Sequence, residues 1–223
     1  MIHNFTRTKN TLETTTLRII AGILRTRKIQ FAVDPRTRPM KDRTREAVMS
    51  LLGGTFPNAI AFDLFGGTGV LAFETVSRGA SKGIVFEILK SAAREIQTNA
   101  KSLGISDSME VIQTDVLDWS KGLPSNCSRF SKNAGEIWVV YCCPPYSLWE
   151  SNGKQLLAML ERWWNAAPLG SLFAVELEES TPTEFLPTQA DWDLRVYKPA
   201  RMAVAEKESP QVDSPKTDTD SAV

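Results

Sequence analysis

A glycine-rich segment contains the residues best suited to bind a cofactor. The segment Asp63-Leu-Phe-Gly-Gly-Thr-Gly69 closes the apolar run 59–65 and stands directly before an expected helix. Gly67 and Gly69 allow a tight turn and a close approach to a ligand, because they have no Cβ. Glu87 ends a second apolar run eighteen residues after Gly69. Its carboxylate can accept hydrogen bonds from the two ribose hydroxyls of an adenosine group.

Two details favour S-adenosylmethionine over a dinucleotide as the cofactor. The glycine spacing is not G-x-G-x-x-G, because Thr68 and Ala72 interrupt it. Asp63 would repel a pyrophosphate, whereas it attracts a cofactor that carries an ammonium and a sulfonium. Asp115, after a third apolar run, is expected to contact the adenine amino group, and a helix N-cap is an equally open role for it. The predicted cofactor-binding residues are Asp63, Phe65, Gly67, Gly69, Glu87 and Asp115. The alternative is a glycine turn in a non-binding α/β domain.

A second motif, Tyr141-Cys142-Cys143-Pro144-Pro145-Tyr146, ends the fourth apolar run and makes a family resemblance specific. The chain resembles the bacterial 16S ribosomal RNA guanine-N2 methyltransferase family (RsmD type) over roughly residues 17–202. The segments that carry the resemblance, in the family's order and at its approximate spacing, are Arg18-Ile-Ile-Ala-Gly22, Arg38-Pro39, Asp42-Arg43-Thr-Arg45-Glu46, Asp63–Gly69 and Pro144-Pro145-Tyr146.

The resemblance implies methyl transfer from S-adenosylmethionine to the exocyclic N2 amine of a guanine in 16S rRNA. In such families the motif is Asp or Asn, Pro, Pro, then Tyr or Phe. The first side chain and a carbonyl of the proline region accept hydrogen bonds from the target amine, and the aromatic ring stacks on the extruded base. The implied catalytic residues of this chain are Cys143, Pro144, Pro145 and Tyr146.

Cys143 departs from the motif, because a thiol is a weak hydrogen-bond acceptor and cannot replace a carboxylate. Three explanations are open. Backbone carbonyls suffice for turnover, the protein binds RNA and cofactor as a pseudoenzyme, or Cys143 is a nucleophile. The last is the least favoured, because C5-pyrimidine methyltransferases place their nucleophilic cysteine after the proline and nothing nearby in sequence lowers the pKa of this thiol. A methyltransferase acting on another nucleic-acid amine or on a small molecule is a further alternative.

The segment before the cofactor loop is basic and predicts an RNA partner. Nine Arg or Lys residues lie between Arg18 and Arg45, against Asp34 and Asp42. Phosphate contacts give affinity and register, so we expect 16S rRNA or a small-subunit assembly particle as the partner. The predicted RNA-binding residues are Arg18, Arg25, Arg27, Arg38, Lys41, Arg43 and Arg45. Arg45 and Glu46 lie early in an expected helix and could instead pair internally, and a solvated basic face is the simpler alternative for the whole segment.

Alternating apolar runs and helical segments must position these residues. Strands are expected at 59–65, 83–87, 109–113, 137–143 and 171–177, with helices at 41–52, 70–78, 90–103 and 153–166. Continuous apolar runs are typical of strands buried on both faces. The expected fold is α/β, a Rossmann-like class I methyltransferase. It has a mainly parallel seven-stranded sheet, helices on both faces and a C-terminal antiparallel hairpin at 192–197 and 202–206.

The chain divides into four predicted parts. Residues 1–16 are expected to be disordered, 17–54 to form a basic RNA-binding extension, 55–206 to form the methyltransferase domain, and 207–223 to be a disordered acidic tail. Three cysteines and one histidine suit neither a disulfide framework nor a metal site. No signal peptide or membrane helix is evident, so we expect a cytoplasmic monomer.

Overall fold

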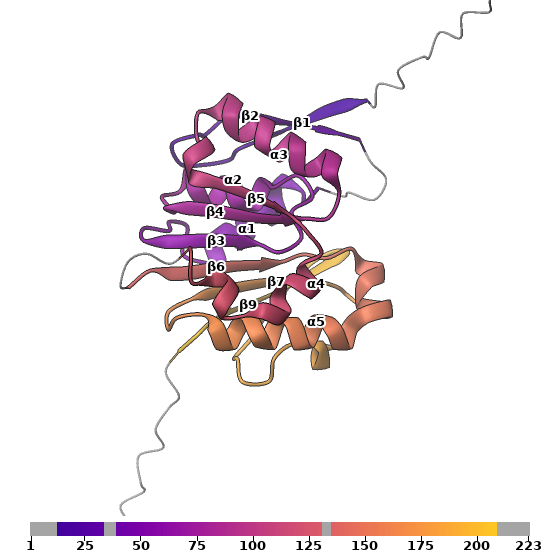
Figure 1. The fold of residues 1–223 in the computed structure, drawn as a ribbon. Coiled ribbons are helices and arrows are strands. Elements are labelled where there is room, and N and C mark those ends of the chain that lie inside the picture. Colours follow the sequence, from indigo (N-terminus) through magenta and orange to yellow (C-terminus); the bar gives the residue numbers. More distant parts are fainter. Residues whose placement is uncertain (1–12, 34–38, 131–134, 209–223) are drawn as a thin grey trace, which may run out of the picture.

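A seven-stranded sheet forms the centre of the protein (Figure 1). The computed structural model describes residues 13–33, 39–130 and 135–208. The order across the sheet is β5-β4-β3-β6-β7-β9-β8. The strands of this sheet are β3 (Ala59–Asp63), β4 (Lys82–Glu87), β5 (Met109–Gln113), β6 (Ile137–Cys142), β7 (Leu172–Glu178), β8 (Asp193–Tyr197) and β9 (Ala200–Glu206). A separate antiparallel pair is formed by β1 (Thr14–Arg18) and β2 (Lys28–Ala32).

The helices of the described residues alternate with these strands. The α-helices are α1 (Asp42–Leu51), α2 (Val70–Ser77), α3 (Lys90–Leu103), α4 (Val116–Trp119) and α5 (Tyr146–Ala166). Short 3-10 turns lie at Ser106–Ser108, Ser120–Gly122, Ser125–Cys127 and Thr183–Phe185. Helix α5 begins seven residues earlier than the expected 153–166, directly after Pro145, and has a kink at Asn152.

The predicted fold class is confirmed. Strands β5, β4, β3, β6 and β7 run parallel to one another, and β9 pairs antiparallel with both β7 and β8. The central strands β3 and β6 are buried along almost their whole length, as strands covered on both faces must be. Their carboxyl ends meet at one edge of the sheet, which is where ligands bind in open α/β sheets.

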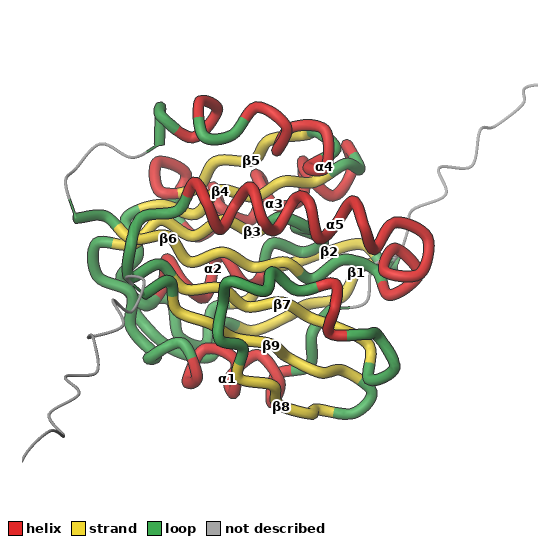
Figure 2. Tube along the Cα trace, turned by 90° about the horizontal axis from the view of Figure 1, so that it is seen from below, coloured by secondary structure: helices red, strands yellow, loops and turns green. Residues whose placement is uncertain are grey.

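Each face of the sheet has its own apolar core. One core holds the side chains of α1, α2, α3 and the β1–β2 pair, together with Ala61, Val85 and Tyr141 of the sheet. The other is formed by α4 and α5 against Phe62 and Val140, and Figure 2 shows α5 lying across the sheet. Trp163 and Trp164 of α5 are both buried in this second core.

The ends of the described chain are more ordered than predicted. Residues 14–16, expected to be disordered, belong to β1 and pair with β2. Lys207, assigned to the tail, donates its backbone N–H to Ser171 and its Nζ to the carbonyls of Trp164 and Ala167. Residues 1–12 and 209–223 lie outside the described part, so the predictions of disorder there are not tested. No helix among the described residues is long and apolar enough to cross a membrane.

Candidate active site

A pocket of about 590 Å³ opens at the carboxyl ends of the parallel strands. This volume is in the range of small-molecule sites, roughly 300–1,000 Å³. Its walls come from the cofactor loop, the ends of β4 and β6, the start of α1 and the β8–β9 turn. The pocket therefore brings together segments that are distant in the sequence.

The glycines of the loop let the backbone form one wall of the pocket. Gly67 and Gly69 have φ values of 53° and 71°, a left-handed conformation that favours glycine. Gly66, which the sequence analysis did not single out, also requires glycine. A Cβ on Gly66 would lie 2.3 Å from the side chain of Val85. Phe65 and Gly67 line the pocket, while Gly69 lies behind it as the N-cap of α2.

Asp63 is a buried carboxyl group at the floor of this loop. It is 1% exposed, and its Oδ1 has no hydrogen-bond partner among the described residues. Burial, and then the negative charge of Glu87, raise the pKa of Asp63 to about 8, although the backbone amides of Phe65 and Ala72 oppose this shift. An ionised carboxylate here lacks a compensating positive charge. A cationic ligand group in the pocket would supply it.

Glu87 and Asp115 lie on the wall contributed by β4 and β5. The two carboxylate oxygens of Glu87 accept hydrogen bonds from the backbone N–H groups of Gly67 and Leu89, both at 2.7 Å. These contacts fix the carboxylate where it lines the pocket. Asp115 is the N-cap of α4, with Oδ1 accepting from the Leu117 N–H at 2.9 Å. It also lines the pocket, so the capping role and a ligand contact are compatible.

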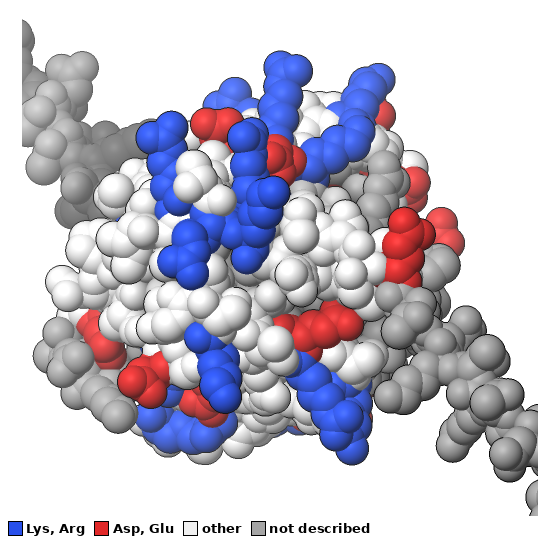
Figure 3. Space-filling model, turned by 90° about the horizontal axis from the view of Figure 1, so that it is seen from above, with Lys and Arg blue, Asp and Glu red and all other residues white. Residues whose placement is uncertain are grey.

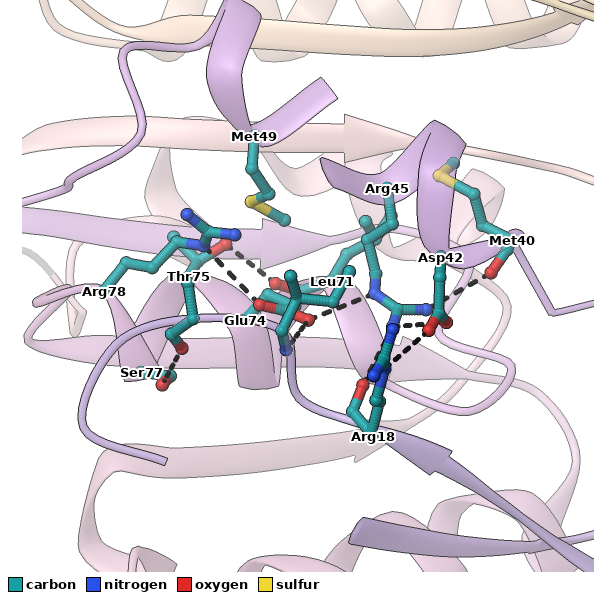
Figure 4. Close-up of polar contacts among 12 residues, drawn as sticks. Arg18, Met40, Asp42, Arg45, Met49, Leu71, Glu74, Thr75, Ser77 and Arg78 are labelled. Carbon is teal, nitrogen blue, oxygen red and sulfur yellow. Dashed lines mark hydrogen bonds and ion pairs between the residues drawn. The ribbon is translucent and has the colours of Figure 1, made fainter. Parts of the chain in front are cut away.

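A buried ionic network holds α1 at the rim of the pocket (Figure 4). Arg45 is 0% exposed, and its Nε lies 3.1 Å from Oε1 of Glu74 in α2. Its other nitrogens donate to the carbonyls of Arg18 and Met40 and to the carboxylate of Asp42. The prediction that Arg45 contacts RNA phosphates is therefore wrong, because the guanidinium is enclosed by internal acceptors. The structure instead shows the alternative, in which Arg45 pairs internally.

The second motif forms the opposite wall of the pocket. Cys143, Pro144, Pro145 and Tyr146 follow β6 directly and all line the pocket. Burial and the negative charges of Glu176 and Asp63 raise the pKa of the Cys143 thiol well above its ordinary value. At neutral pH Cys143 is therefore a neutral thiol, which argues against the hypothesis that Cys143 is a nucleophile. Tyr146 begins α5 and donates its hydroxyl to Oε1 of Glu176 at 2.9 Å.

Glu176 of β7 lines the pocket but was not predicted from the sequence. Its backbone carbonyl accepts a hydrogen bond from Nε1 of the buried Trp149 at 3.0 Å. Pairing of Cys142 with Val175 places Glu176 opposite Cys143 on the neighbouring strand. A single acidic residue in the apolar run 171–177 was the available signal. Its meaning depends on the strand order, which brings β7 next to β6.

The predicted RNA-binding residues lie at two places on the surface. Arg25 and Arg27 are exposed between β1 and β2, and Lys41 and Arg43 are exposed at the start of α1. Figure 3, which views the side with the β1–β2 pair and α3, shows Lys and Arg side chains gathered on this face. Arg18 is also exposed but pairs with Asp42 at 2.9 Å. Arg38 lies outside the described residues.

The described residues of the pocket do not form a metal site. No three His, Cys, Asp or Glu side chains within residues 13–33, 39–130 and 135–208 are arranged to hold a metal ion. The carboxyl groups of Asp63 and Glu87 instead face a pocket with backbone amides and apolar walls, as a nucleoside with a charged side chain would require.

Comparisons with known proteins agree with this arrangement. A family described as Conserved hypothetical protein 95 matches residues 17–195. Ribosomal RNA small subunit methyltransferase D of Haemophilus influenzae is 32% identical over 180 residues, which are 80% of this chain and 86% of that protein. The protein of the same name from Buchnera aphidicola is 37% identical, over 46% of this chain and 53% of its own length. The crystal structure of a proposed methylase from Haemophilus influenzae is 26% identical with a TM-score of 0.66, covering 87% of this chain and 100% of that one.

Proposed function

The chain belongs to the family described as Conserved hypothetical protein 95, and on this premise we propose that it is an S-adenosylmethionine-dependent methyltransferase of small-subunit ribosomal RNA. The methyl acceptor in this proposal is the exocyclic N2 amine of a guanine in 16S rRNA, presented free or in an assembly particle. The relatives named ribosomal RNA small subunit methyltransferase D support the rRNA substrate. The protein would act in the cytoplasm, and the monomeric state stays a prediction.

The unpaired Oδ1 of Asp63 is the observation that carries the choice of cofactor. A fully buried carboxyl oxygen without a partner among the described residues fits the ammonium of a methionine moiety. Gly67, which lines the pocket with a φ of 53°, has no Cβ to obstruct a ligand at the loop. Glu87, fixed by two backbone amides, would accept hydrogen bonds from the ribose hydroxyls, and Asp115 from the adenine amine. S-adenosylmethionine supplies an electrophilic methyl group when bound.

The residues of the second motif would hold the acceptor base. Tyr146 would stack on the extruded guanine, and the backbone of Cys143–Pro145 would orient its amine toward the cofactor pocket. No covalent enzyme intermediate is needed, in keeping with the neutral thiol of Cys143. The exposed Arg25, Arg27, Lys41 and Arg43 would bind phosphates and hold the RNA in register.

Turnover separates this proposal from an RNA-binding pseudoenzyme of the same fold. Purified protein is incubated with S-adenosylmethionine labelled in the methyl group and with 16S rRNA, or small-subunit particles, from cells that lack the gene. We expect label in RNA to exceed the amount of enzyme and to stop at one methyl per RNA. Saturable binding of RNA without incorporation would instead establish the pseudoenzyme, in which Cys143 has removed turnover.

A further inference from the structure

Four side chains, three with carboxyl groups and one with a thiol, lie in a row across the floor of the pocket. Side chains alternate between the faces of a sheet, and Val85, Ala61, Tyr141 and Ala174 all belong to the core on the α1–α2 face. The next residues that point to this face are Glu87, Asp63, Cys143 and Glu176, on four neighbouring strands. All four line the pocket. Glu87 and Asp63 occupy its cofactor half, so Cys143 and Glu176 form the acceptor half.

Cys143 and Glu176 are neighbours within that half. The negative charge of Glu176 raises the pKa of the Cys143 thiol, and the Glu176 backbone amide opposes this shift. The strand register has the same consequence, because Cys142 pairs with Val175. Glu176 therefore lies on the strand next to Cys143, the position at which the 16S rRNA guanine-N2 methyltransferase family has Asp or Asn.

The Glu176 side chain is also tied to the ring expected to stack on the base. Tyr146 donates its hydroxyl to Oε1 at 2.9 Å, and Trp149 holds the Glu176 carbonyl. The two oxygens of a carboxylate offer about four lone-pair sites, so a carboxylate can accept several hydrogen bonds at once. The aromatic ring and the carboxylate are thus positioned as one unit.

We propose that Glu176 is a catalytic residue whose carboxylate accepts hydrogen bonds from the target amine, taking over the role that Cys143 cannot perform. This inference rests on the proposed function. In the transfer step, the amine nitrogen forms a bond to the methyl carbon while the carbon–sulfur bond of the cofactor breaks and its electron pair remains on sulfur. The excess proton on the methylated nitrogen passes to the Glu176 carboxylate and from there to water.

The test compares Glu176→Gln with a matched control on the same strand, Glu178→Gln, whose side chain is outside the pocket. Glutamine keeps an oxygen for the Tyr146 hydroxyl but removes the charge and the proton acceptor. We expect kcat of Glu176→Gln to fall about 100-fold and the acidic limb of its pH–rate profile to disappear. Binding of substrate RNA with S-adenosylhomocysteine present should weaken about tenfold. S-adenosylhomocysteine affinity by calorimetry, and the thermal unfolding temperature, should match those of Glu178→Gln.

A rescue experiment separates chemistry from structure. Adding Cys143→Asp to Glu176→Gln returns a carboxylate to the neighbouring strand and should restore at least about tenfold in kcat. An unchanged kcat and pH profile in Glu176→Gln, or no gain from the added aspartate, would overturn the assignment of Glu176 alone. Absence of methyl transfer by the wild-type protein would overturn it together with the proposed function.

Discussion

Nε of Arg45 lies 3.1 Å from Oε1 of Glu74, and neither side chain is exposed to solvent. The same Glu74 oxygen accepts the backbone N–H of Ile20 at 2.7 Å. One buried carboxylate thus joins the segment after β1, helix α1 and helix α2 (Figure 4). Lys41 and Thr44, at the start of α1, line the pocket. The Arg45–Glu74 pair therefore stabilises the fold and also fixes this wall of the pocket.

Removal of one partner of this pair should destabilise the protein strongly. Arg45→Met leaves the buried Glu74 carboxylate with only Arg78, whose Nε lies 3.5 Å from its Oε2, and should cost about 3–5 kcal/mol in the free energy of unfolding. Urea denaturation followed by circular dichroism measures this change. The double variant Arg45→Met, Glu74→Met should lose less than the sum of the single variants, since each single variant already removes the Arg45–Glu74 interaction. Additive losses would show that the two side chains do not interact.

Cofactor binding should release a proton from Asp63. The pKa of this carboxyl group is about 8 without a ligand, so binding of an ammonium near pH 7 should release about one proton. Calorimetry in buffers of different ionisation enthalpy measures that number. For the ligand-free protein, the raised pKa means that the contribution of Asp63 to stability is lost as pH rises from 3.8 to about 8. Asp63→Asn should remove both effects, and proton release that persists in this variant would assign it to another group.

Tyr146 should affect the RNA step but not the cofactor step. Loss of a stacking ring costs about 1–3 kcal/mol per base, so Tyr146→Ala should lower kcat/KM for RNA about 5- to 150-fold. Tyr146→Phe keeps the aromatic ring and should retain most of the wild-type kcat/KM for RNA. Calorimetric titration with S-adenosylhomocysteine should give the wild-type affinity for both variants. A weaker cofactor affinity in Tyr146→Ala would mean that the ring contacts the cofactor and not the base, contrary to this prediction.

The exposed basic residues should account for part of the salt dependence of RNA binding. Each of Arg25→Ala, Arg27→Ala and Arg43→Ala should weaken binding and lower the slope of log Kd against log salt by about one. Arg162→Ala is the matched control, because Arg162 is exposed on α5 at the opposite face of the sheet. Filter binding across a series of salt concentrations gives the slopes. Equal effects of Arg162→Ala would mean that RNA contacts are not confined to the predicted segment.

The sheet and its loops could be predicted because their signals are local. The strand expected at 109–113 matches β5 at both ends, and the glycines after Asp63 located the turn into α2. The first turns of α5 were not predicted, because Asn152 and Gly153 have low helix propensity and the structure has a kink there. The helix nevertheless begins at Tyr146, directly after the proline turn.

Two residues show why the rest of the site could not be predicted. Arg45 has the same sequence context as its exposed neighbour Arg43, and its contacts with Glu74, 29 residues away, and with the carbonyl of Arg18 explain its burial. Glu176 acquires its significance from the strand order, which places β7 beside β6. Both depend on tertiary contacts between distant segments, which composition and periodicity do not contain.

The identity of the methylated nucleoside tests the central claim most directly. Small-subunit rRNA from cells lacking the gene is incubated with the protein and S-adenosylmethionine, digested to nucleosides and separated by liquid chromatography with mass spectrometry. The proposal predicts one new product, N2-methylguanosine, formed by wild-type protein and strongly reduced with Glu176→Gln. A methyl group on any other nucleoside, or no new product with wild-type protein, would contradict it.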